Sequence, residues 1–75
     1  MGKTRDIQYL QKFGDRVRKL RTTKGWSQYD LAAASGVERS KLGHIERGST
    51  NTTLSTAKLI AEAFEMTLSE LVDFR

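Results

Sequence analysis

The chain has 75 residues, no cysteine, one histidine and a formal net charge of +4 at pH 7. This composition excludes a disulfide framework, a thiolate metal site and a metal cage of histidines, and the length predicts one domain, residues 1–75. The polar opening, and the lack of any apolar run near the roughly 18 residues of a membrane span, predict a cytoplasmic protein with no membrane partner, metal or other cofactor.

Because the chain contains no proline, it reads as an all-α fold, and five helices joined by short turns are expected. The first is predicted over residues 7–24, with Asp6 or Thr4 as its N-cap. Its apolar stripe has helical spacing and consists of Leu10, Phe13, Val17 and Leu20. Gly25 ends this helix, and Trp26 is expected to pack over the junction rather than to stack on a base.

The second helix is predicted over residues 28–35, with Ser27 as its N-cap and Asp30 completing an approximate capping box. Ala32 lies in its middle, where only a small side chain lets another helix cross closely. Gly36 follows in a turn whose backbone is expected to need a positive φ angle. The spacing predicts two short helices joined by a sharp turn.

The third helix is predicted over residues 39–47, with one apolar and one polar face. The inward positions of this helix, of the turn and of the preceding helix are Leu31, Val37, Leu42 and Ile45. The outward stripe at i, i+4, i+7 spacing contains Ser40, His44 and Arg47, with Arg39 and Lys41 beside it. A helix with such a stripe fits the major groove of DNA, whose base edges present distinguishable donors and acceptors.

Residues 48–52 form a loop by composition. Thr53 is the predicted N-cap of a fourth helix that runs through Phe64. The positions of that helix that are spaced for burial are Leu54, Ala57, Ile60 or Ala61, and Phe64. Thr67 and Glu70 form a capping box that opens a fifth helix, predicted over residues 68–73.

The segment KLRTTKGWSQYDLAAASGVERSKLGHIERG resembles the Cro/C1-type (XRE-like) helix-turn-helix family of phage repressors and bacterial regulators. The later segment TLSTAKLIAEAFEMTLSELV is similar to the two closing helices of that family. The matching motif positions are Gln28, Ala32, Gly36, Val37, Leu42, Ile45, Glu46 and Gly48. The resemblance implies a compact five-helix, lambda-repressor-like domain, with the motif at residues 28–47 and closing or dimerisation helices at residues 53–74.

The chain departs from the family pattern at two turns. Glu38 stands where Ser or Thr is usual, so we expect a weaker cap at the start of the third helix. Glu65 stands where many relatives carry a helix-ending glycine. A left-handed residue there is expected to strain the turn by about 1 kcal/mol.

Four residues at the start and along the outside of the third helix are candidates for base contacts. Arg39 opens the helix, and its guanidinium can bond guanine O6 and N7 together. Ser40 and His44 match family positions that face base edges. Glu38 is able to accept from cytosine N4, although a role at the helix terminus is preferred. Contacts to the DNA backbone are expected from Gln28, Lys41, Arg47, Ser49, Thr50, Asn51 and Thr52.

Two further sets have structural roles. The resemblance makes Arg21 and Glu46 an ion pair that ties the end of the third helix to the first. The last twelve residues carry more apolar side chains than one short helix needs to dock, and they predict a homodimer interface: Met66, Leu68, Leu71, Val72 and Phe74. The alternative is that all five simply close the core.

These features predict a sequence-specific, nucleoid-associated transcriptional regulator that binds a palindromic operator on double-stranded DNA as a homodimer. Residues 1–47 hold eleven Lys and Arg against five Asp and Glu, whereas residues 48–75 hold two against four, which favours a DNA-facing and a partner-facing end. ERGSTNTTL, followed by the closing helices, resembles the restriction–modification controller proteins, and this resemblance favours a controller over a phage Cro-like repressor or an antitoxin. Blocking RNA polymerase and touching it from an adjacent site both stay open.

Two other functional classes were weighed. A protein-interaction module that does not read DNA is the main alternative, and such a module should lack a coherent basic stripe. An enzyme is not expected, because the sequence offers no nucleophile–base pair, metal cluster or phosphate-cradling glycine loop.

Overall fold

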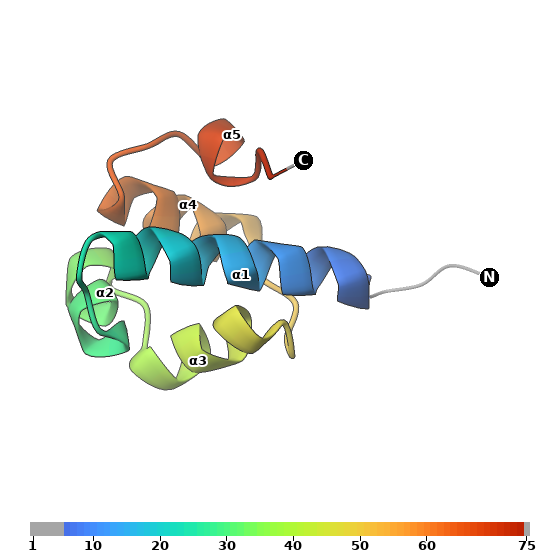
Figure 1. The fold of residues 1–75 in the computed structure, drawn as a ribbon, viewed down its shortest axis with the longest axis horizontal. Coiled ribbons are helices and arrows are strands. Elements are labelled where there is room, and N and C mark those ends of the chain that lie inside the picture. The colour runs from blue at the N-terminus through green and yellow to red at the C-terminus, as the bar shows by residue number, and fades with distance from the viewer. Residues whose placement is uncertain (1–5, 75) are drawn as a thin grey trace.

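The computed structural model describes residues 6–74 and contains only α-helices in that range (Figure 1). The helices are α1 (Ile7–Thr23), α2 (Gln28–Ser35), α3 (Arg39–Arg47), α4 (Leu54–Ala63) and α5 (Leu68–Leu71). The prediction of an all-α fold with five helices is therefore confirmed. Asp6 caps α1, since its carboxylate accepts a hydrogen bond from the Tyr9 backbone N–H at 3.1 Å. Thr4, the alternative cap, lies outside the described residues.

Both motif helices begin and end at the predicted residues, and α1 and α4 each end one residue early. The larger difference is α5, which ends at Leu71 and not at residue 73. The guanidinium of Arg16, on α1, donates to the carbonyls of Glu70 and Leu71 at 2.8 and 3.1 Å. These carbonyls are satisfied from another helix, so a further turn of α5 is not needed to pair them.

The long helix α1 runs through the middle of the molecule, with α3 on one side and α4 and α5 on the other (Figure 1). The buried apolar core is drawn from all five helices and the turn before α3, and contains Phe13, Val17, Leu31, Val37, Leu42, Ile45, Ala57, Ile60, Ala61, Phe64 and Leu71. The four inward positions predicted for the motif are all among them. Leu10 and Leu20, at the ends of the predicted stripe on α1, are only half-buried.

One predicted core position is wrong. Leu54 was expected to be buried, yet 78% of its surface is exposed. Leu54 is the first residue of α4, and its side chain is not covered by another helix. It lines an open apolar groove together with Tyr9, Leu68 and Val72. Helical spacing alone does not show where along a helix the core stops.

The close crossing of α1 over α3 depends on Gly14, which the sequence analysis did not single out. A Cβ atom added at Gly14 would lie 2.3 Å from the Ile45 carbonyl oxygen and 2.6 Å from that of Glu46. Only glycine allows this approach. It brings the middle of α1 against the backbone at the end of α3.

Two turns and one aromatic contact agree with the sequence analysis. Gly36 has φ 78°, the positive angle expected between α2 and α3, and Glu65 has φ 57°, so the strained left-handed residue predicted after α4 is present. The Trp26 ring stacks on Phe64 with ring centres 5.8 Å apart. This tryptophan therefore covers the junction after α1, as predicted.

Candidate nucleic-acid interface

Local hydrogen bonds fix the angle between α2 and α3. The Ser27 hydroxyl accepts from the Asp30 N–H at 3.1 Å, and the Asp30 carboxylate accepts from the Ser27 N–H at 2.8 Å, so the capping box is complete. At the other end, the buried Ser35 hydroxyl accepts from the Val37 N–H at 3.1 Å, a bond not predicted from the sequence. Glu38 occupies the N-cap position of α3 without a side-chain cap bond, which is the weaker cap expected there.

The helix α3 presents its polar residues outward. The side chains of Arg39, Ser40, Lys41, His44 and Arg47 are exposed, whereas Leu42, Ile45 and Glu46 are buried. Gly43 is buried as well, because side chains lie over it: a Cβ atom there would be 3.4 Å from Arg47 Nη1 and 3.8 Å from Arg39 Nη1. The two guanidinium groups therefore lie over the same stretch of α3.

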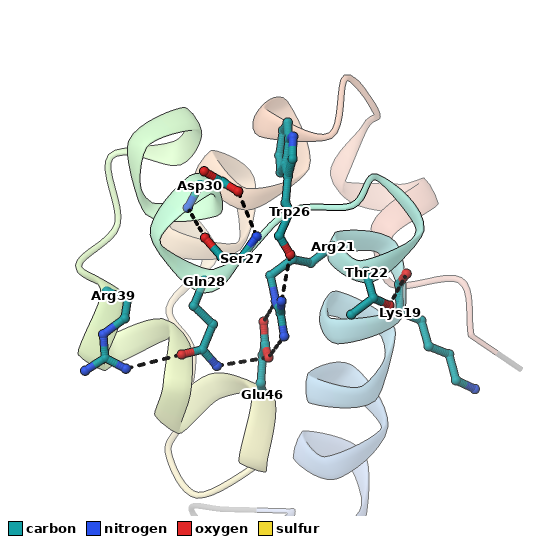
Figure 2. A network of polar contacts seen from close by, with 9 residues as sticks. All are labelled: Lys19, Arg21, Thr22, Trp26, Ser27, Gln28, Asp30, Arg39 and Glu46. Carbon is teal, nitrogen blue, oxygen red and sulfur yellow. Dashed lines mark hydrogen bonds and ion pairs between the residues drawn. The ribbon is translucent and has the colours of Figure 1, made fainter.

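The buried end of α3 is tied to α1 by an ion pair (Figure 2). Arg21 Nε donates to Glu46 Oε2 at 2.7 Å, and Arg21 Nη2 donates to Oε1 at 2.9 Å. A third bond runs from Nη1 to the Trp26 carbonyl at 2.8 Å. Only 14% of the Arg21 side chain and 4% of the Glu46 side chain are exposed. The hydrogen bond to Glu46 raises the pKa of Arg21, burial opposes the rise, and the charge of Glu46 adds to it.

Gln28 connects this ion pair to the start of α3 (Figure 2). Its Nε2 donates to Glu46 Oε1 at 3.1 Å, and its Oε1 accepts from Arg39 Nη1 at 3.2 Å. Since an ionised carboxylate only accepts and a guanidinium only donates, the amide has one possible orientation. The bonds form a connected network in which Arg21 and Gln28 both donate to the Glu46 carboxylate, and Arg39 donates to Gln28.

Arg39 has a second contact that the sequence analysis missed. The centre of its guanidinium lies 5.4 Å from the centre of the Tyr29 ring, a distance typical of a cation–π contact. Tyr29 is 72% exposed and follows Gln28 on the first turn of α2. The available signal was an aromatic residue directly after Gln28 and ten positions before an arginine. Arg39 is thus held at two points on the surface of α2.

His44, Arg47 and Ser49 form a small cluster at the other end of α3. His44 Nδ1 lies 3.1 Å from Arg47 Nη2 and 3.3 Å from the Ser49 hydroxyl. That hydroxyl also lies 3.2 Å from the His44 carbonyl oxygen, to which it can donate.

The loop after α3 places three of its four candidate residues at or near the surface. Ser49 and Asn51 are exposed and Thr50 is partly exposed. The expectation for Thr52 needs correction: its hydroxyl oxygen is buried and has no hydrogen-bond partner in the part of the chain that the structure describes. A hydroxyl closed off from solvent cannot reach a phosphate, so Thr52 is left out of the proposed interface.

The prediction for the closing end of the molecule, α4 to α5, also needs one correction. Leu71 has no exposed surface, so it belongs to the core and has no area to offer a partner. The other four candidates for a dimer interface, Met66, Leu68, Val72 and Phe74, are partly exposed and pack against the core. The large apolar side chains exposed nearby are on other helices: Tyr9 contacts the Phe74 ring at 5.1 Å, and Leu54 lines the same groove as Leu68 and Val72.

No group of three or more His, Asp or Glu residues within residues 6–74 is arranged to hold a metal ion. Over the same range, none of the helices combines the length and the apolar character needed to cross a bilayer.

Comparison with known proteins gives a consistent match. The helix-turn-helix family HTH_3 matches residues 17–71. The control protein C.BamHI of Bacillus amyloliquefaciens is 35% identical over 72 residues, which are 95% of this chain and 86% of that protein. The transcriptional regulator SutR of Escherichia coli is 36% identical over 56 residues, 75% of this chain, but the chain spans only 32% of its length.

Solved structures agree with this match. The restriction–modification controller protein C.AhdI of Aeromonas hydrophila is similar with a TM-score of 0.79 and 47% identity, over 83% of this chain and 94% of that one. The controller protein C.Esp1396I, solved as a tetramer with its natural 35 base-pair operator, is similar with a TM-score of 0.77 and 30% identity, over 89% of this chain and 97% of that one.

Proposed function

This chain belongs to the helix-turn-helix family HTH_3, and we propose that it is a transcriptional regulator that controls a restriction–modification system. In this proposal it binds a palindromic operator on double-stranded DNA as a homodimer, without enzymatic activity. The control protein C.BamHI and the controller C.AhdI, both similar over most of their length, support the controller type over a phage repressor or an antitoxin.

The observation that carries the proposal is the outward face of α3. Its exposed side chains are polar or basic, and those at its start and end are held in place by neighbours. A protein-interaction module of this fold has no need for such a face. A preorganised basic helix is what major-groove recognition requires, because little ordering is then left to occur on binding.

The base-reading residues in this proposal are Arg39, Ser40 and His44. Arg39 projects from the first turn of α3 with its guanidinium supported on α2, which suits two parallel hydrogen bonds to guanine O6 and N7. Glu38, exposed just before the helix, is the candidate acceptor for cytosine N4.

Phosphate contacts come from the residues around this face: Lys41, Arg47, Ser49, Thr50 and Asn51. These contacts supply most of the affinity and its dependence on salt, while the base contacts select the site. Gln28 is the remaining candidate. Both atoms of its amide are already bonded, so it reaches a phosphate only by opening one of those bonds, and its main role here is to hold Arg39.

The dimer contact is assigned to the closing end, at Met66, Leu68, Val72 and Phe74. This end lies on the side of α1 opposite to α3, so a partner there leaves α3 free (Figure 1). In a symmetric pair the two α3 helices would enter successive major grooves about 34–36 Å apart. Occupancy of such a site regulates transcription by blocking RNA polymerase or by touching it from beside the promoter, which places the protein in the cytoplasm at the nucleoid.

Selection of bound sites from random duplexes tests the proposal. The expected result is a palindrome with two half-sites one helical turn apart, preferred over bulk competitor DNA at moderate ionic strength. If no duplex is preferred over competitor, the proposed function is wrong.

A further inference from the structure

We propose that Arg47 fixes the ring of His44 in the tautomer whose Nε2 carries the hydrogen, so that His44 reads a hydrogen-bond acceptor in the operator, favouring guanine over cytosine. The recognition part of this inference rests on the proposed function. The tautomer itself is a property of the free protein.

The argument begins at Nδ1 of His44. This atom lies 3.1 Å from Arg47 Nη2. A guanidinium has five N–H donors and no acceptor, and it stays protonated at any pH at which proteins fold. If Nδ1 also carried a hydrogen, two donors would face each other at bonding distance. Nδ1 must therefore hold a lone pair, and in the neutral ring the hydrogen is on Nε2.

Ser49 does not decide between the tautomers. Its hydroxyl lies 3.3 Å from Nδ1 and 3.2 Å from the His44 carbonyl oxygen. If the hydroxyl donates to Nδ1, the ring has the same tautomer that Arg47 requires. If it donates to the carbonyl, its oxygen could accept from an Nδ1–H. Ser49 is compatible with both forms, so the choice depends on Arg47.

Within residues 6–74, the Ser49 hydroxyl is the one acceptor recorded at hydrogen-bond distance from Nδ1, and it is compatible with either tautomer. The hollow beside the ring is also lined by Glu38 and Lys41 from the start of α3, by Thr50 from the loop, and by Thr56 and Leu59 from α4. Glu38 and Lys41 are the charged groups of that lining. Within residues 6–74, neither of them is hydrogen-bonded to the His44 ring. Nε2 is left as the donor on an exposed side chain.

A donor selects among bases by what they present in the major groove. Guanine offers two acceptors, N7 and O6, with no donor between them, whereas the major-groove edge of cytosine offers only the N4 amino donor. An Nε2–H therefore favours guanine and rejects cytosine at the base it contacts. The opposite tautomer would present a lone pair at Nε2 and prefer a donor such as cytosine N4.

The first test needs no DNA. Because His44 is the one histidine of the chain, nitrogen NMR of the untagged, 15N-labelled protein shows one imidazole and needs no assignment. Above the titration range of the ring, we expect Nε2 to carry the hydrogen and Nδ1 to show the signature of an unprotonated nitrogen. Arg47→Met, which keeps the aliphatic stem, should raise the share of the Nδ1–H form roughly three- to tenfold, the effect of one hydrogen bond on an exposed surface.

Two outcomes of this test would overturn the proposal. One is an Nδ1–H ring in the unchanged protein. The other is a tautomer that responds to Ser49→Ala and not to Arg47→Met, since Ser49 would then be the residue in control. Arg47→Lys retains a donor-only cation and is expected to restore the tautomer of the unchanged protein.

The second test measures base preference on the selected operator. The ratio of affinities for guanine and cytosine at the contacted position should fall roughly three- to tenfold in Arg47→Met. This ratio is insensitive to a phosphate contact that Arg47 also makes, because that contact is shared by both sequences. His44→Gln should move the preference toward adenine, which pairs with an amide in two hydrogen bonds.

The two tests separate the inference from the proposed function. An Nε2–H ring in a protein that prefers no duplex would leave the tautomer in place and refute DNA reading. A sequence preference that ignores both His44→Gln and Arg47→Met would refute the recognition role of His44 and leave the proposed function standing.

Discussion

The reading end of the molecule, α2 to α3, and its closing end, α4 to α5, differ in the kind of contacts that their exposed side chains make. At the reading end, polar groups are bonded to one another in a connected network that links Arg21, Glu46, Gln28 and Arg39, with each donor and acceptor fixed. At the closing end, apolar side chains such as Leu54 are left in contact with solvent. The first region is complete within one chain, and the second is suited to be completed by another copy.

The comparison shows which exposed side chains have a fixed geometry before any partner binds. Directional bonds hold an exposed side chain in one arrangement before any ligand arrives, which favours selective recognition. Apolar contact is not directional, so the closing end can pack against a partner without a predefined set of bonds. The two ends should therefore respond differently to mutation, and substitutions at each end test that difference.

The largest effect is expected at the reading end, from Glu46→Gln. This change keeps the shape of the side chain but leaves Arg21, only 14% exposed, with an uncompensated charge, and it should lower the free energy of unfolding by about 3–5 kcal/mol. Urea denaturation measures the loss. As a control, Arg21→Met combined with Glu46→Gln should recover part of it, because no unpaired charge remains.

The pH dependence of the ion pair follows from Arg21. Since its pKa is raised above the already high ordinary value of a guanidinium, the contribution of this group is fully present below that ordinary value and fades only as the pH rises through the raised one. Alkaline titration from neutral pH to about 10 should cause no loss of stability from this arginine. An early alkaline loss that disappears in Arg21→Met would contradict the assignment.

At the closing end, Leu71 and Leu54 form a matched pair of leucines. Leu71→Ala removes a fully buried side chain and should cost about 2–5 kcal/mol of stability in the monomer. Leu54→Ala should change the stability of the dilute monomer by less than about 0.5 kcal/mol. It should still weaken self-association if the groove it lines meets a partner, as sedimentation over a concentration series will show. Equal effects of the two changes on the monomer would remove the contrast between core and contact surface.

At the reading end, Arg39→Ala should weaken the binding free energy on the preferred operator by about 1–3 kcal/mol and relax the choice at one base position. An equal loss on random DNA would show that Arg39 touches only phosphate. Tyr29 sharpens the test: Tyr29→Phe keeps the ring under the guanidinium and should bind like the unchanged protein. Tyr29→Ala removes the ring and should lose part of the selectivity.

The same two regions differ in how well the sequence predicts them. The bounds of α2 and α3, the capping box at Ser27 and the positive φ of Gly36 follow from local residue preferences, and all were predicted correctly. At the closing end, α5 was predicted too long, Leu54 was predicted buried, and Leu71 was assigned to a partner. Each of these depends on which other helix lies nearby, as the bonds from Arg16 to the end of α5 show.

The exposed residues of the candidate site were predicted from the sequence, but the hydrogen bonds that join them to other helices were not. Periodicity correctly placed Ser40, His44 and Arg47 on one exposed face. It could not show that Gln28 joins Glu46 to Arg39, because those bonds link residues far apart in the chain. The need for glycine at position 14 was equally hidden, since it arises from the backbone of α3 and not from α1 itself.

The smallest expected effect belongs to Glu65→Gly, at the turn before α5. Glu65 has φ 57°, a conformation that costs a residue with a Cβ atom about 1–2 kcal/mol and costs glycine little. The greater backbone freedom of glycine in the unfolded chain offsets part of the gain, so a net stabilisation of about 0.5–1 kcal/mol is expected by urea denaturation. Glu65→Ala removes the same charge but keeps the Cβ atom, and it should not stabilise. A gain from both variants would mean that the carboxylate, and not the backbone, is the source of strain. Operator affinity should be unchanged in either case, because Glu65 is neither on α3 nor among the proposed dimer contacts.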